Sequence, residues 1–299
     1  MEYLMTYGWS ILIVAVVLGA LAYLGVFNPL YFAPKANPGS CQVFRPNGAG
    51  TSYDINLLGV CQSEVPEYVA QFNGQSSYVK LPSGQALLGT TPTGGTITAW
   101  VALERYPYGN NLCCSGYGGI VSVAKTTGNG YPDGYDTFAI GIMNNSGDIS
   151  GQHMWWDVAG SSGTWGGTNG ISTVIWVFVA LSFEGSTGNA YLNSDNVMLL
   201  GTISGMQLDT NPSYIGKWMN GGFIDGYISD VQIYNTSLDS ASVNALYQEG
   251  IGGAPIDLKN LVGWWPLNGN ANDYSGNGNN GVPTNVVYTS SWISSYNPP

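Results

Sequence analysis

Charged side chains are scarce in this chain of 299 residues. Only 8% of its residues are Asp, Glu, Lys or Arg, against about 25% in an ordinary soluble domain. Seven are basic and 18 are acidic, which leaves a net charge of −11. A nucleic-acid surface needs a basic stripe, so this balance excludes nucleic acid as a partner. Disorder is excluded too, because disordered segments are poor in aromatic residues, whereas this chain has 10 Trp and 20 Tyr.

Histidine is nearly absent as well. Catalysis by a serine or cysteine nucleophile needs a base, and the single histidine, His153, has no nucleophile pattern beside it. Zinc sites draw on closely spaced Cys and His ligands, but no Cys-x-x-Cys pair occurs. These absences favour a protein that is not an enzyme and that holds no zinc.

The cysteine count is low but even, at four, which favours disulfide bonds in an exported chain. Cys41 and Cys61 flank a polar segment with a Pro-Asn-Gly turn, and we predict that they pair in a hairpin. Cys113 and Cys114 are adjacent, so they either form a strained disulfide with each other or stay reduced.

The start of the chain is long and apolar. Residues 3–34 contain no charged side chain. A helix of about 25 residues spans roughly 38 Å, and the hydrocarbon core of a bilayer is about 30 Å thick. No Lys or Arg precedes the run, and the run is too long for a cleavable secretory signal. Asn28 and Pro29 should end the helix, because proline disfavours helical geometry at the residue before it.

Glu2 stands at the head of this apolar run, Tyr3–Phe27. These residues resemble the start of archaeal type IV pilin-like proteins, in which a basic leader is cut off by a prepilin peptidase; this chain shows no leader. The resemblance implies a helix that sits in the cytoplasmic membrane and then packs in the core of a homo-oligomeric filament. Glu2 would there pair with the amine of Met1 of a neighbouring subunit. The alternative is an acid favoured by the helix dipole and interfacial water, on a simple membrane anchor.

From about Tyr68 onward, short apolar runs alternate with Gly, Asn, Ser and Pro clusters. Turn signals at such short intervals predict an all-β sandwich or barrel. The predicted strands cover 68–72, 78–81, 96–103, 119–124, 137–143, 154–158, 174–183, 190–192, 197–203, 213–217 and 226–234. One helix is predicted over 241–249, with Asp239 or Ser240 as its cap and Gly250 as its stop.

Several pieces of this region carry a second pattern, namely Ala70–Val79, Thr96–Val101, Gly226–Asn235, Leu261–Gly269 and Asn272–Gly281. Together they resemble the laminin-G-like or concanavalin-like lectin sandwich, a jelly roll. In its common order the piece with Trp264 and Trp265 comes first, whereas here it comes last. We therefore predict a circularly permuted sandwich in which Leu261–Leu267 pairs with Ile228–Tyr234, since domain termini often lie close together. The alternative is a second, truncated domain.

The predicted organisation has three parts. A hydrophobic pilin-type helix covers 1–28, a linker with the disulfide-closed hairpin covers 29–67, and the lectin-like sandwich covers 68–299. Two triplets in the sandwich fit the pattern for N-glycosylation, and they begin at Asn144 and Asn235.

The lectin resemblance also implies a structural calcium ion. Calcium takes six to eight oxygen ligands, and Asp273 opens a loop rich in Gly and Asn that includes Asn277. Asp230 and Asn73 lie in pieces that the permutation should bring near this loop. We predict these four residues as ligands. The alternative is that they are turn residues that bond the local backbone.

Carbohydrate binding would use exposed aromatic rings beside amides and carboxylates, because sugar rings stack on aromatic faces. The candidates are Trp155, Trp156, Asp157, Trp165 and Tyr135. Only one of two sequence neighbours on a strand can face inward, and the alternative for the rings is core filling. The sandwich glycosidases that share the resemblance carry Glu-x-Asp-x-Glu strands, and this chain has none, which again speaks against an enzyme.

Taken together, the sequence predicts a structural subunit of an archaeal type IV pilus-like filament, exposed on the cell surface. Its lectin-like domain would adhere to glycans or to a host or neighbouring cell. The alternative is a membrane-anchored extracellular carbohydrate-binding protein that does not polymerise.

Overall fold

The computed structural model describes residues 14, 16, 43–44, 54–55, 66–106, 116–126, 132–144, 152–158, 161–165, 171–201, 203, 206–218, 221–292, 296–297 and 299. The backbone alone is described at 43–44, 54–55, 124–126, 132–137, 143–144, 152–153 and 161–165. Of the predicted N-terminal helix, only Val14 and Val16 belong to this set. Several predicted residues lie outside it, namely Met1, Glu2, Cys41, Cys61, Cys113 and Cys114. Within the described residues, no helix is both long enough and apolar enough to cross a bilayer.

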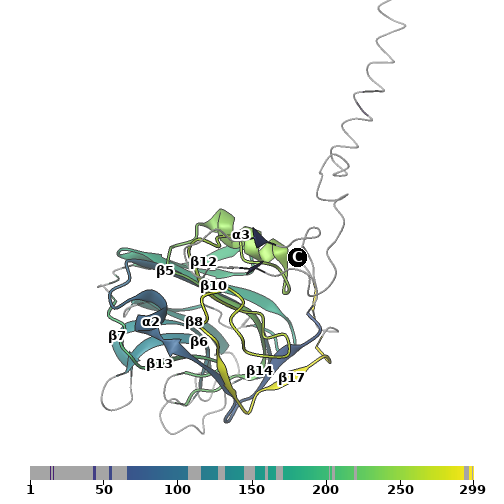
Figure 1. Cartoon of the computed structure of the whole chain (residues 1–299), viewed down its shortest axis with the longest axis horizontal. Coiled ribbons are helices and arrows are strands. Elements are labelled where there is room, and N and C mark those ends of the chain that lie inside the picture. The colour runs from purple at the N-terminus through teal and green to yellow at the C-terminus, as the bar shows by residue number, and fades with distance from the viewer. Residues whose placement is uncertain are drawn as a thin grey trace, which may run out of the picture.

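The predicted all-β jelly-roll sandwich is confirmed, with two antiparallel sheets (Figure 1). The eight-stranded sheet runs in the order β12 (Asp195–Gly201), β11 (Thr187–Leu192), β10 (Val177–Glu184), β5 (Gly94–Arg105), β14 (Asp225–Tyr234), β3 (Val69–Asn73) and β17 (Val287–Thr289), and β15 (Leu261–Trp265) also pairs with β14. The seven-stranded sheet runs in the order β16 (Val282–Thr284), β4 (Tyr78–Ser83), β13 (Pro212–Ile215), β6 (Tyr117–Thr126), β7 (Pro132–Asn144), β8 (Gln152–Val158) and β9 (Ser161–Trp165). A separate pair is formed by β1 (Val43–Phe44) and β2 (Asp54–Ile55).

Two short helices accompany the sheets, α2 (Gly84–Leu88) and α3 (Ser240–Glu249). The second is the helix that the sequence predicts. Its cap is Asp239, whose carboxylate accepts a 2.8 Å hydrogen bond from the backbone of Ser242, and it ends at Gly250, which has a φ of 79°. This positive φ is one that glycine adopts without strain.

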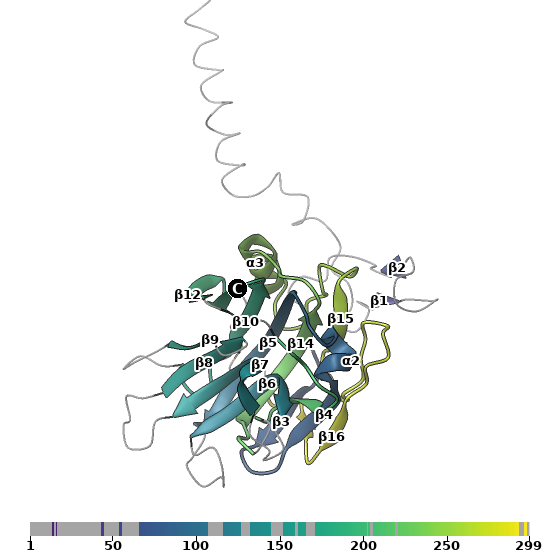
Figure 2. The same ribbon diagram turned by 90° about the vertical axis from the view of Figure 1, so that its left-hand side faces the viewer.

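Apolar side chains fill two layers. The main core lies between the sheets, where residues such as Ile97 and Val231 meet Ile140 and Trp156. A second apolar layer lies on the outer face of the eight-stranded sheet, where Trp100, Phe178, Tyr234 and Trp264 pack with α3 residues such as Leu246. Figures 1 and 2 both place α3 on this side, away from β6.

The end of the chain completes both sheets. Along one edge of β14, Asp225–Ile228 pairs with β3 and Val231–Tyr234 pairs with β15. The predicted pairing of Leu261–Leu267 with Ile228–Tyr234 is therefore confirmed. The strands β16 and β17 continue onto β4 and β3, the first two strands of the sandwich, which Figure 1 shows as yellow beside blue. Residues 282–289 thus add one strand to each sheet of the sandwich.

Candidate functional site

A group of aromatic side chains lies on the outer face of the seven-stranded sheet. Side chains alternate along a strand, so the neighbours of core residues such as Val79, Ile215 and Trp156 point outward. We call the aromatic face the set formed by Tyr78, Tyr117, Trp155, Tyr214, Lys217, Trp218 and Phe223. It draws on β4, β6, β8, β13 and the turn that follows β13.

At one end of the aromatic face, Trp155 contacts both Trp218 and Tyr117. Its centroid lies 4.7 Å from that of Trp218 at an interplanar angle of 81°, and 6.1 Å from that of Tyr117 at 84°. These edge-to-face contacts are favoured by the charge distribution of aromatic rings. Trp155 nevertheless remains partly exposed, while Trp218 is only 7% exposed. The two neighbours therefore hold the Trp155 ring without covering it.

At the other end, Lys217 lies among three rings. Its ammonium is 4.6 Å from the centroid of Tyr214, 4.8 Å from that of Tyr78 and 5.7 Å from that of Phe223. Such cation–π contacts are each worth about 0.5–1 kcal/mol at exposed sites. Burial, and then the nearby Tyr78, raises the pKa of the Tyr214 phenol, so this hydroxyl stays protonated and can both donate and accept hydrogen bonds.

The turn that carries Lys217 and Trp218 rests on Gly119. The backbone N–H groups of Gly119 and Trp218 both donate to the carbonyl of Gly222, at 3.1 and 2.6 Å. A Cβ atom at position 119 would lie 2.5 Å from the carbonyl carbon of Lys217 and from the nitrogen of Trp218. Only glycine allows the turn to come this close to β6. The position of the turn then determines how the Trp218 ring contacts Trp155.

The residues that the sequence predicts to bind carbohydrate do not all lie at the surface of the structure. Trp155 lies on the aromatic face, but its neighbour Trp156 is fully buried in the core and has no surface to offer a sugar. Asp157 is also buried, at 6% exposed. Trp165 and Tyr135 lie in β9 and β7, and their side chains fall outside the described residues. The sequence reasoning missed the other rings of the aromatic face, although alternation along 213–217 points Tyr214 outward.

The predicted calcium ligands of the 268–281 loop are occupied by the chain itself. Oδ1 of Asp273 accepts backbone hydrogen bonds from Trp264 and Ser275, at 3.0 and 2.8 Å, and its Oδ2 accepts one from Asn279 at 2.8 Å. The amide of Asn277 donates to the carbonyls of residues 261 and 262, at 2.8 and 2.9 Å. Both side chains bond the local backbone.

The other two predicted ligands do not complete a site. Trp264 links Asp230 to Asp273, because its Nε1 donates to Asp230 and its backbone N–H donates to Asp273. Asn73 pairs with Asp225, five residues along β14 from Asp230, which is about 16 Å. Among the described residues, no three His, Cys, Asp or Glu side chains gather as a metal site. The four residues therefore do not fit one calcium ion.

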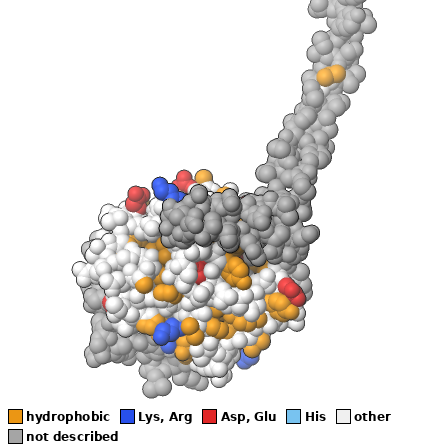
Figure 3. Space-filling model, viewed as in Figure 1, with side chains coloured by type: hydrophobic (Ala, Val, Ile, Leu, Met, Phe, Trp, Pro, Cys, Tyr) orange, Lys and Arg blue, Asp and Glu red, His pale blue; other side chains and the backbone are white. Residues whose placement is uncertain are grey.

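The glycosylation candidates lie at strand ends. Asn235 follows β14 and is exposed, and Asn144 is the last residue of β7, with a side chain outside the described set. The face of the molecule seen in Figure 3 carries few charged side chains, with hydrophobic groups spread among uncharged ones.

The range from β3 to α3 has known relatives. Residues 73–244 match the family model of the concanavalin A-like lectin/glucanase superfamily. The chain belongs to this superfamily. The match covers more than half of the 299 residues and contains every residue of the aromatic face. Among curated proteins, none matches the chain.

Solved structures with this fold are similar in architecture and distant in sequence. A Bacteroides ovatus protein described as a candidate carbohydrate-binding protein has a TM-score of 0.54 and 17% identity, over 75% of this chain and 60% of its own. The heptameric SAP-like pentraxin of Limulus polyphemus has a TM-score of 0.49 and 16% identity, over 74% of this chain and 94% of its own. This chain thus spans about 60% of the length of the Bacteroides protein. At such identities the likeness to the Bacteroides protein shows the shared fold alone.

Proposed function

We propose that this chain is an extracellular carbohydrate-binding protein whose sugar site is the aromatic face. The observation that carries the proposal is the ring of Trp155, which is partly exposed and is held at its edges by Trp218 and Tyr117. Aromatic rings combine a large apolar area with a defined orientation. A fixed, accessible ring suits the flat apolar face of a sugar, and membership of the concanavalin A-like lectin/glucanase superfamily agrees with a site for carbohydrate.

Polar groups beside the ring would set the orientation of the sugar. The hydroxyl groups of Tyr78 and Tyr214 belong to the same face, and ligand sites use a few such groups for specificity. We propose binding without catalysis. Hydrolysis of a glycosidic bond uses a pair of carboxyl groups, and the aromatic face as defined contains none.

The test is binding of the full chain, in detergent, to an immobilised panel of glycans. Trp155→Ala should weaken binding at least ten-fold, which is about 1.4 kcal/mol, because the stacking surface is lost. Trp155→Phe should retain part of the affinity, since a ring remains. Leu199→Ala is the control, because Leu199 is 71% exposed on the other sheet. Unchanged binding by Trp155→Ala, or no glycan bound by the wild type, would contradict the proposal.

The role of residues 1–28 rests on the sequence, and we propose a pilin-type helix as a second function. The residues in favour are Glu2 and the apolar run after it. The helix would stand in the cytoplasmic membrane and then bundle with copies of itself. Electron microscopy of material sheared from the cell surface tests this role, with Glu2→Gln expected to remove filaments. Protein found only in the membrane fraction would favour the anchor that does not polymerise.

We also infer that the sandwich is circularly permuted relative to the common order of its family. The support is the pairing of β15, β16 and β17 with β14, β4 and β3, which brings the last strands beside the first. The piece with Trp264 and Trp265 then occupies the place that the common order gives to an opening strand.

A further inference from the structure

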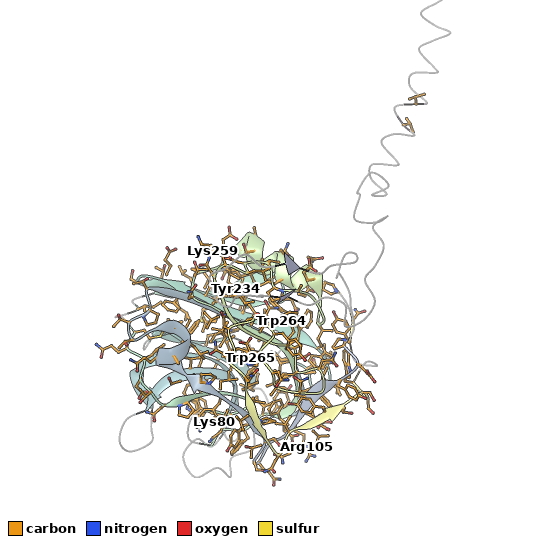
Figure 4. The ribbon with its side chains drawn as sticks, in the orientation of Figure 1. Lys80, Arg105, Tyr234, Lys259, Trp264 and Trp265 are labelled. Atoms are coloured by element: carbon orange, nitrogen blue, oxygen red, sulfur yellow. The ribbon has the colours of Figure 1, made fainter. Side chains whose placement is uncertain are left out.

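A group of partly exposed polar side chains lies on the outer face of the eight-stranded sheet. Along β3, β5 and β14 the neighbours of core residues point outward, which places Gln71, Glu104 and Tyr227 there; we call them the polar triad. Glu104 precedes Arg105, which Figure 4 labels near the lower edge of the sandwich, whereas Tyr234 is labelled in its upper half. The second apolar layer packs with α3 around Tyr234, and the polar triad lies at its border, where Tyr227 packs against it.

The polar triad is joined by hydrogen bonds that converge on Glu104. The Tyr227 hydroxyl donates to Oε1 of Glu104 at 2.5 Å, and Nε2 of Gln71 donates to its two carboxylate oxygens at 3.3 and 3.2 Å. Arg105 forms its ion pair with Asp225 at 3.4 Å, and within the described part of the chain no cation pairs with Glu104. The triad thus presents a carboxylate and an amide oxygen, both acceptors, at a partly exposed surface.

The protonation of Tyr227 keeps this arrangement in place. Burial first, and then the hydrogen bond to Glu104, raises the pKa of Tyr227 to about 12. The phenol is therefore protonated at neutral pH and keeps its donor directed at the carboxylate. The other acceptor positions of the Glu104 carboxylate and the Gln71 amide oxygen stay directed at the surface.

An apolar wall borders the polar triad. The ring of Trp176 lies 6.2 Å from that of Tyr227, and the two residues before it, Val174 and Ile175, are 55% and 52% exposed. Val174 has a φ of 62°, and its N–H donates to the carbonyl of Leu103 at 2.6 Å, which fixes it beside Glu104. A β-branched residue rarely adopts such a φ, and residues held in this way gather at ligand sites.

We propose that the polar triad, with Val174 and Ile175, forms a second saccharide-binding surface, and that its ligands are neutral sugars. A sugar ring offers hydroxyl donors to the Glu104 and Gln71 oxygens and an apolar C–H face to the aliphatic wall. An acidic sugar would bring its charge toward the unpaired carboxylate, which like-charge repulsion opposes. The ligand class rests on the proposed function, but this surface lies on the opposite sheet from the aromatic face, so one domain would bind two glycan segments.

Saturation-transfer NMR on the full chain in detergent tests this inference, with mannotriose, cellotriose, galactotriose and trigalacturonate as probes. Trp155→Ala should leave transfer to at least one neutral trisaccharide. Adding Glu104→Gln and Tyr227→Phe to Trp155→Ala should reduce this remaining transfer at least ten-fold. Any transfer to trigalacturonate should not change with these two substitutions. If the combined variant unfolds, Ile175→Asp replaces it, because Ile175 is exposed and the new charge blocks the wall without touching the triad.

The outcomes separate the two proposals. If Trp155→Ala alone abolishes all transfer, the second surface is wrong and the aromatic face stands. If the triad variants abolish transfer to every sugar and Trp155→Ala abolishes transfer to none, the second surface stands and the aromatic face is wrong. A trigalacturonate signal that vanishes with Glu104→Gln would overturn the preference for neutral sugars. A wild type that gives no transfer to any probe would overturn both surfaces.

Discussion

The indole Nε1 of Trp264 donates a 2.7 Å hydrogen bond to Oδ1 of Asp230, and this bond ties β15 to β14 beneath α3. Nε2 of Gln232 donates to both oxygens of Asp230, at 3.1 and 3.0 Å, and the Tyr234 hydroxyl donates to Gln232 at 2.5 Å. Figure 4 shows Tyr234 and Trp264 in the same region of the molecule. Asp230 is only 4% exposed. The network therefore holds a carboxyl group inside an apolar layer.

This burial predicts a distinctive pH dependence. Burial is the main reason that the pKa of Asp230 rises from 3.8 to about 7; the bonds from Gln232 and Trp264 lower it, and Glu249 raises it. Between these two values the folded state keeps a proton that the unfolded state has lost, so the contribution of Asp230 to stability is full below pH 4 and is lost as the pH rises through 7. The loss should amount to a few kcal/mol.

Asp230→Asn should remove this slope. Asparagine keeps an acceptor for Trp264 and tolerates the φ of 48° at this position. Urea unfolding between pH 4 and pH 8 should show the wild type losing stability relative to Asp230→Asn. Asp195→Asn, at an exposed position, is the matched control and should follow the wild type. Parallel curves for the wild type and Asp230→Asn would show that the buried carboxyl does not titrate in this range.

The close packing at Gly119 predicts that alanine is poorly tolerated there. The added Cβ would stand 2.5 Å from the backbone of the Lys217 turn, and such overpacking costs about 1–3 kcal/mol. The turn should shift and carry Trp218 away from Trp155. We expect lower stability in urea, a changed near-UV circular dichroism spectrum and weaker glycan binding. Gly201→Ala, with nothing within 4 Å of the new Cβ, should change none of them; a normal spectrum for Gly119→Ala would contradict the role given to the turn.

The side chain of Asp273 should contribute more to the free energy of unfolding than the side chains beside it in the same loop. Its carboxylate accepts three backbone hydrogen bonds, and each buried donor left without a partner costs about 1–3 kcal/mol. Asp273→Ala should therefore lower the free energy of unfolding by about 2–4 kcal/mol, measured in urea. Asn272→Ala, an exposed position next to it, should change it by less than about 0.5 kcal/mol. Equal effects of the two variants would mean that the loop is held by something else.

The same contacts predict an outcome for metal removal. Because the backbone already surrounds Asp273, and Asn73 lies far from Asp230, the melting temperature should be the same in calcium and in excess chelator. Differential scanning calorimetry measures this directly, and magnesium at the same concentration controls for ionic strength. A fall of several degrees in chelator, reversed by calcium alone, would show that a calcium site exists on other residues of the chain.

Local patterns were enough to predict some of these features and not others. The cap at Asp239, the stop at Gly250 and the strand over Leu261–Trp265 each follow from short stretches of sequence, because caps and alternation are local properties. The contact of Trp218 with Trp155 depends on a turn that packs against a distant strand, and no local pattern encodes it. The strands β16 and β17 are only three residues long. A segment this short does not show a recognisable alternation of apolar and polar residues.

The predicted calcium ligands failed to gather for a different reason. Asp and Asn suit both metal ligation and turns that bond the backbone, so the residue type at position 273 fits either role. Only the positions of the N–H donors from residues 264, 275 and 279 distinguish them. The predicted pairing of Leu261–Leu267 with Ile228–Tyr234 brings Trp264 near Asp230. Pairing alone does not show that the side chains of Trp264 and Gln232 both donate to this carboxyl group.

Trp265 tests whether the end of the chain is part of the sandwich in solution. Its side chain is fully buried in the core between the sheets, and its Nε1 donates to the carbonyl of Asn279 at 2.9 Å. Trp265→Ala should lower the free energy of unfolding by about 3–5 kcal/mol. Trp156→Ala, an equally buried tryptophan of the seven-stranded sheet, should cost a similar amount, and both should unfold in one transition, because the two rings share one core. Had the C-terminal residues formed a unit of their own, Trp265→Ala would leave the main urea transition where it is in the wild type, and only Trp156→Ala would move it.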